Sequence, residues 1–139
     1  MSDPPYRTAH VTDLPTPATD EPGLSAWRAM RIHFGITAFG VNAYAAEDAG
    51  GELSPEHTEL TDSGTRHEEL FFVGSGHARF TIGGETVDAP AGTFVYVPDP
   101  AVVRSATALE AGTTLLAVGG EPGKAFEVSP WEQEYAQRA

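Results

Sequence analysis

Closely spaced glycines divide the middle of this sequence into short stretches, and this pattern constrains the fold more than any other feature. Residues 66–105 read RHEELFFVGSGHARFTIGGETVDAPAGTFVYVPDPAVVRS. Strand-forming residues alternate there with turn signals, and the Gly-Gly pair of TIGGET is typical of a tight hairpin because glycine tolerates positive φ. Short strands with little helix between them predict an all-β sandwich or barrel.

The alternation of apolar and polar residues predicts eight strands. Turn signals containing Gly or Pro separate most of them. The expected strands cover residues 36–46, 53–59, 67–74, 76–82, 85–89, 93–97, 101–109 and 113–119.

The two ends of the chain have a different character. Residues 1–24 hold five prolines, which predicts an extended N-terminal arm before a barrel domain over residues 25–125. SAWRAMRIHF is compatible with one short helix that has Ser25 as its N-cap, Trp27, Met30 and Phe34 on one face, and Gly35 as its end. Residues 126–139 contain Phe126, Trp131 and Tyr135, and we expect this tail to pack on the barrel or on a second subunit.

Composition excludes several classes of function. The chain has 139 residues, of which 40% are hydrophobic, and this suits a single domain. It has no cysteine, so thiolate chemistry is excluded, and its net charge of -12 makes nucleic acid an unsuitable partner. No stretch is apolar enough to cross a membrane and the start lacks a secretory pattern, so we expect a soluble, cytoplasmic protein.

Two histidines and two acids form the main candidate site. His57 and Glu59 share one face of a strand, as do His67 and Glu69, because side chains alternate along strands. If both faces look into the barrel, four side chains suited to a divalent metal converge there. Nitrogen and oxygen donors without sulfur suit Fe, Mn, Ni or Zn.

The motifs around these residues resemble those of the cupin superfamily of small jelly-roll β-barrels. Gly51, five residues and then His57-Thr58-Glu59 match the opening of the first cupin motif, and Glu69, six further residues and then Gly76 match its close. Gly92 and Pro98 match the start of the second motif. HEELFFV, with a WE pair near the C-terminus, resembles a group of small actinobacterial cupin-domain proteins. The resemblance implies a cupin jelly-roll, a homodimer and a pocket in the barrel.

The departures from these motifs put the usual cupin metal site in doubt. The family site has three His and one Glu, whereas Glu59 stands here in place of the second His and Val103 in place of the third. Nine residues rather than three or four separate Glu59 from Glu69, so the hairpin must bulge or lengthen.

Arg104 is a competing partner for the acids, because it could neutralise Glu69 or clamp a substrate carboxylate. The family register nevertheless points Val103 inward and Arg104 outward unless Pro100 introduces a bulge, so we expect the outward orientation.

Two functions remain open at this point. One is a small-molecule-binding cupin with an altered metal site and no organic cofactor. As an enzyme of oxygenase or isomerase type, it would use His57 and Glu69 as ligands and Glu59 or His67 as ligand or general base. The other is a metal-free cupin that binds a ligand or acts in regulation or assembly, with the same four residues as a polar cluster. Candidate pocket walls are Tyr44, Phe71, Phe80, Tyr96 and Arg104.

Overall fold

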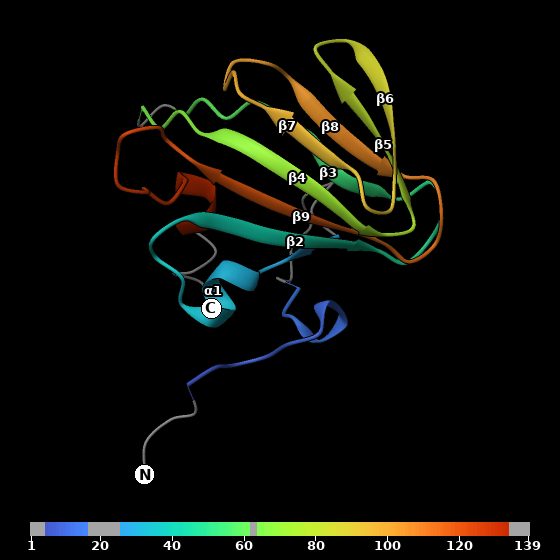
Figure 1. Cartoon of the computed structure of the whole chain (residues 1–139), viewed down its shortest axis with the longest axis horizontal. Coiled ribbons are helices and arrows are strands. Elements are labelled where there is room, and N and C mark those ends of the chain that lie inside the picture. Colours follow the sequence, from blue (N-terminus) through green and yellow to red (C-terminus); the bar gives the residue numbers. More distant parts are fainter. Residues whose placement is uncertain (1–4, 17–25, 62–63, 134–139) are drawn as a thin grey trace.

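Two antiparallel sheets make up the protein in the computed structural model, which describes residues 5–16, 26–61 and 64–133. One sheet has the strand order β1-β2-β9-β4-β7 and the other β3-β8-β5-β6. β2, β9 and β4 run side by side in Figure 1, and β5 and β6 form a hairpin of the second sheet. The strands are β1 (Trp27–Arg28), β2 (Gly40–Ala46), β3 (Glu52–His57), β4 (Glu68–Ser75), β5 (His77–Ile82), β6 (Glu85–Pro90), β7 (Phe94–Val97), β8 (Arg104–Ala108) and β9 (Thr113–Gly120). The predicted all-β class is confirmed.

Both sheets contribute side chains to one apolar core. Along β4, Glu69, Phe71 and Val73 are buried and alternate with more exposed neighbours, so the carboxylate of Glu69 lies on the core face. The largest apolar side chains of this core are Trp27, Tyr44, Leu53, Phe71, Phe80 and Leu115.

The glycine signals place most of the turns correctly. Gly83 and Gly84 have φ values of 56° and 85° and join β5 to β6 where Ile82 pairs with Glu85. Two strands begin three or more residues later than expected. β2 begins at Gly40 rather than residue 36, and β8 begins at Arg104 because residues 99–102 form a turn in which Val102 N–H donates to Asp99 O.

The expected helix is shorter and begins later than the sequence suggests. Ser25 lies outside the described residues, and Trp27 belongs to β1, where it pairs with Tyr44. The helix α1 covers Met30–Phe34 and ends at Gly35, whose φ of 70° is the left-handed value that glycine favours. The prediction that Trp27 and Met30 share a helical face is therefore wrong. Trp27 lies on a strand, which buries its indole in the core at 0% exposure.

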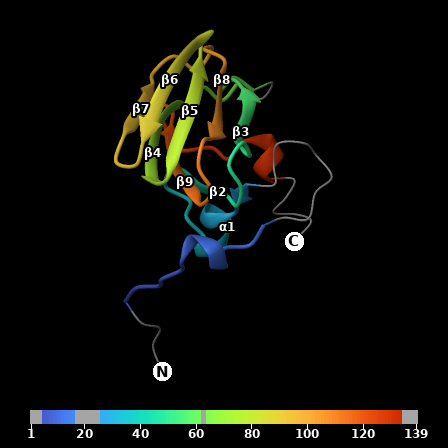
Figure 2. The same cartoon turned by 90° about the vertical axis from the view of Figure 1, so that its right-hand side faces the viewer.

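The two termini reach this body at different places. The N-terminal segment holds a 3-10 turn, η1 (Val11–Asp13), and Pro15 O accepts a hydrogen bond from Ala29 N–H. The chain after β9 returns to the barrel near β2 and α1, as Figures 1 and 2 show. There the rings of Trp131 and Trp27 meet edge to face at 4.9 Å. Tyr135 and residues 1–4 and 17–25 lie outside the described residues. None of the helices in the described ranges is long and apolar enough to cross a membrane.

Candidate functional site

His57, the last residue of β3, is oriented by its own strand. Its Nδ1 lies 2.8 Å from the carbonyl oxygen of Pro55, and because a carbonyl only accepts, Nδ1 carries the hydrogen. Nε2 is thereby directed at two carboxylates, 3.0 Å from Glu59 Oε1 and 3.7 Å from Glu69 Oε1. The backbone of β3 therefore fixes which nitrogen is presented to the barrel interior.

The segment between the two acids links β3 of one sheet to β4 of the other. Leu60 and Arg66 pair as an isolated antiparallel bridge, and Glu59 N–H donates to Pro100 O at 2.9 Å. Glu69 is held within β4, paired with Val97 of β7 and Gly119 of β9. The expected hairpin is reduced to this single bridge, because β3 pairs with β8 whereas β4 pairs with β7 and β9.

Arg104 points into the barrel, so the expected outward orientation is wrong. Its side chain is 0% exposed, and NH1 donates to Glu69 Oε1 at 3.2 Å. Its remaining nitrogens donate to the carbonyl oxygens of Val102 and Asp99. The turn over residues 99–102 shifts the alternation of the strand by one residue. Val103, which was expected to point inward, is 43% exposed, and Arg104 points inward in its place.

His67 lies beside the cluster with less direct contact. The residue is 6% exposed, its Nδ1 is 4.0 Å from Glu59 Oε2, and its ring lies 5.4 Å from the ring of Phe126. Its Nε2 is buried and has no hydrogen-bond partner among residues 5–16, 26–61 and 64–133. The predicted four-residue set therefore divides into a tight group of three and one flanking histidine.

The charges of the cluster are strongly coupled. Burial disfavours the imidazolium, but its interactions as a donor to the carboxylates of Glu59 and Glu69 outweigh burial and raise the pKa of His57 to about 10. Burial also favours neutral carboxyl groups. The hydrogen bond from His57 overcomes this for Glu59, whose pKa is lowered, whereas burial and the charge of Glu59 leave the pKa of Glu69 raised. Without a metal, His57 is therefore a positively charged imidazolium at neutral pH, with a hydrogen on both ring nitrogens.

The side chains of this group fit a divalent metal with three protein ligands. One donor atom each from His57, Glu59 and Glu69 lies within 4.8 Å of the others. Metal–ligand distances are about 2.0–2.2 Å for nitrogen and oxygen donors, so two ligands of one ion lie up to about 4.4 Å apart, and the three donors would have to draw slightly closer to hold an ion. The carbonyl that binds His57 Nδ1 is the kind of outer partner that metal-ligating histidines have. Arg104 supplies a cation rather than a fourth ligand.

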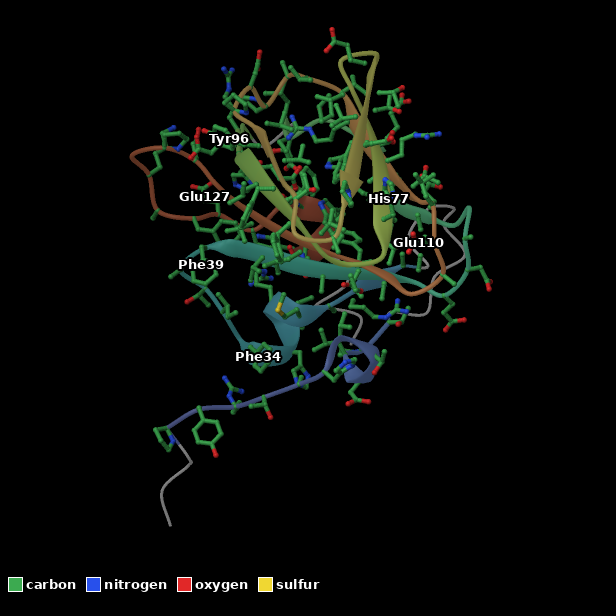
Figure 3. All side chains as sticks on the ribbon, turned by 45° about the vertical axis from the view of Figure 1, so that its right-hand side comes forward. Phe34, Phe39, His77, Tyr96, Glu110 and Glu127 are labelled. Atoms are coloured by element: carbon green, nitrogen blue, oxygen red, sulfur yellow. The ribbon has the colours of Figure 1, made fainter. Side chains whose placement is uncertain are left out.

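The candidate pocket walls have three different environments. Tyr44 lines a cavity next to the acids, and burial together with the charges of Glu69, Glu59 and Glu132 raises the pKa of its phenol. Phe71 and Phe80 pack on each other at 5.1 Å in the core and do not line this cavity. Tyr96 is 55% exposed and donates to Glu68, and Figure 3 shows it at the periphery, so its predicted place in the pocket is wrong. Inward positions on β7 belong to Val95 and Val97.

The cavity beside the cluster measures about 50 Å³ and also involves residues that the sequence did not reveal. Asn42 of β2 lines it, together with Phe126, Trp131 and Glu132 of the C-terminal segment. Glu132 Oε1 accepts from Arg31 Nε at 2.7 Å and from Asn42 Nδ2 at 3.4 Å, and both pairs are buried. These partners lie 101 and 90 residues from Glu132 in the chain, so no local pattern could have indicated them.

Comparison of the sequence with protein-family models and with curated proteins gives no match. Among solved structures, a cupin protein from Bacteroides fragilis superposes with a TM-score of 0.56 at 20% identity, over 72% of this chain and 80% of that chain. The chain has the cupin fold. The cupin domain of Cnp3 from Schizosaccharomyces pombe is also similar, with a TM-score of 0.50 at 15% identity over 65% of this chain and 54% of that chain. The resemblance seen in the sequence is thus confirmed for the fold.

Proposed function

We propose that the protein binds a small polar molecule at this end of the barrel with the help of one divalent metal ion held by His57, Glu59 and Glu69. The observation that carries the proposal is the hydrogen bond from His57 Nδ1 to Pro55 O, which aims Nε2 at both carboxylates. An imidazole nitrogen and two carboxylates in this arrangement suit Fe, Mn, Ni or Zn.

The chain's own groups have separate tasks in this proposal. A bound ion would act as a Lewis acid that polarises an oxygen of the ligand. Arg104 neutralises part of the charge of Glu69 and holds that carboxylate in place by a buried hydrogen bond. His67 lies beside the group, with Nδ1 4.0 Å from Glu59 Oε2, and as a general base it would have to move closer to the proton that it takes.

The inward position of Arg104 favours a second candidate, a metal-free ligand-binding cupin. With His57 protonated, the positive charges of His57 and Arg104 balance the negative charges of Glu59 and Glu69. A buried cluster that is already neutral does not need an added cation for charge balance.

Elemental analysis of untagged protein, purified without chelator and compared with His57→Ala and Glu69→Gln, distinguishes the two candidates. His77→Ala is a matched control, because His77 lies on β5 away from this group. Near-stoichiometric metal in wild type and His77→Ala, lost in the two site variants, supports the metal site. Folded wild type that takes up no Fe, Mn, Ni or Zn after reconstitution refutes it and leaves the metal-free candidate.

A homodimer is part of the same proposal. The aromatic side chains of Phe94 and Tyr96 on the edge strand β7 are 65% and 55% exposed, and Trp131 is 39% exposed. Phe94 and Tyr96 share the exposed face of β7, whereas Trp131 packs on Trp27 of β1 at the opposite edge of the sheet. Exposed apolar patches on monomeric proteins are often interaction sites. Light scattering that gives a strict monomer at micromolar concentration would refute the dimer.

A further inference from the structure

We infer that the cavity beside the metal-ligand group binds a primary amine or ammonium group of a small molecule. The inference rests on the proposal that this end of the barrel is a ligand site, and it adds the chemical class of the ligand. It does not rest on a metal being bound. The cavity measures about 50 Å³, which has room for a head group of a few heavy atoms rather than for a large ligand.

Two buried polar side chains that line this cavity lack partners for one atom each. Asn42 is 8% exposed, and its Nδ2 donates to Glu132 Oε1, which leaves Oδ1 as an acceptor with no partner in the described ranges. His67 is 6% exposed, and its Nε2 is likewise unpartnered among those residues. Buried polar atoms without partners cost stability, so such atoms around a cavity indicate a polar occupant.

The unpartnered atoms call for a ligand that donates more than one hydrogen. Asn42 Oδ1 can only accept. The carboxylate of Glu59 is 4.0 Å from Nδ1 of His67, and in the tautomer that carries its hydrogen on this nitrogen Nε2 is an acceptor. A hydroxyl group has one hydrogen and cannot serve both acceptors, whereas an amine has two and an ammonium group has three.

The lining of the cavity also suits a group that donates hydrogen bonds. The cavity is lined by the carboxylates of Glu59, Glu69 and Glu132, and no Lys or Arg is found among its described lining residues. Arg31 and Arg104 hydrogen-bond to Glu132 and Glu69 without lining the cavity. The rings of three further lining residues, Tyr44, Phe126 and Trp131, complete the wall, and the guanidinium of Arg31 already lies 5.9 Å from the centre of the Phe126 ring.

Methylammonium chloride is the probe that tests this inference, with tryptophan fluorescence as the readout because Trp131 lines the cavity. We expect a saturable change with methylammonium and none with tetramethylammonium, which has the same charge but no N–H, or with sodium formate, which donates no hydrogen. Asn42→Leu and His67→Phe each remove one acceptor at similar size, and each should weaken binding by roughly tenfold or more.

His77→Phe is the matched control, because His77 Nε2 is also buried and unpartnered in the described structure but lies outside this cavity. Binding retained in His77→Phe and lost in either cavity variant supports the inference. Should Asn42→Leu fail to fold, His67→Phe and the two control salts still decide. No saturable change in wild type, an equal response to tetramethylammonium, or binding unaffected by both cavity variants would overturn it.

The metal proposal and the amine inference can fail separately. Metal content that depends on His57, together with no methylammonium binding, overturns the amine site alone. Methylammonium binding by chelator-treated protein that takes up no metal supports the amine site and refutes the metal site.

Discussion

Replacing the buried Arg104 by methionine should be among the most damaging single changes in the barrel. The guanidinium is 0% exposed and donates to Glu69 and to the carbonyl oxygens of Val102 and Asp99. Methionine fills a similar volume but leaves the Glu69 carboxylate buried without this cation. Removing one partner of a buried ion pair costs about 3–5 kcal/mol of unfolding free energy, a large part of the roughly 5–15 kcal/mol of a typical domain.

Urea unfolding in the presence of a chelator measures this cost. A loss of about 4 kcal/mol lowers the midpoint by roughly 2 M urea at a slope of about 2 kcal/mol/M. Arg79→Met is the matched control, since the Arg79–Asp88 pair has side chains 49% and 60% exposed and such pairs contribute at most about 1 kcal/mol. The penalty of Arg104→Met should also shrink as the pH falls, because the pKa of Glu69 is already raised and protonation removes its unpaired charge.

A double-mutant cycle with Glu69→Gln tests the cause. Glu69→Gln alone should cost less than Arg104→Met, because the guanidinium keeps its backbone carbonyl partners. The double variant should be more stable than the sum of the single effects predicts. Additivity within about 0.5 kcal/mol, or a cost of Arg104→Met no larger than that of Arg79→Met, would refute the buried ion pair.

Three further predictions concern other parts of the structure. Although burial lowers the pKa of His57, the neighbouring carboxylates raise it from 6.5 to about 10. The stability that protonated His57 gives the metal-free protein is therefore complete below pH 6.5 and is lost as the pH rises towards 10. Urea midpoints should fall over this window in wild type but not in His57→Gln. Glu132→Leu leaves Arg31 buried without its ion-pair partner and should cost about 3–5 kcal/mol; an unchanged midpoint contradicts this. Gly76→Ala should lower the melting temperature more than Gly50→Ala: both have positive φ, but only at Gly76 would Cβ meet other atoms; equal shifts contradict this.

The sequence predicts the strands well because their signals are local. Gly83 and Gly84 mark a turn through their own backbone freedom, and the alternation along β4 places Glu69 on the core face without knowledge of the partner strands. Trp27 was misplaced because a helical spacing near Met30 competes with burial of the indole against β2, which only the folded chain reveals.

The candidate site was harder to predict because its parts come from distant segments. His57, Glu59 and Glu69 could be grouped because a family motif links them. Arg104 was misassigned because one turn reverses the alternation of β8. The cavity could not be predicted from any local pattern, since β2 and the C-terminal segment meet only in the folded protein.

The inward arginine changes what an occupant of this barrel must provide. If a dication binds, His57 must give up its proton, and the dication with Glu59, Glu69 and Arg104 then sums to one positive charge. That state is favoured by a ligand that brings a negative group to the metal. Without metal, protonated His57 and Arg104 balance Glu59 and Glu69, and the lining atoms Asn42 Oδ1 and His67 Nε2 have no hydrogen-bond partner in the described ranges. The position of one guanidinium therefore links the chemistry of the ligand to the occupancy of the metal site.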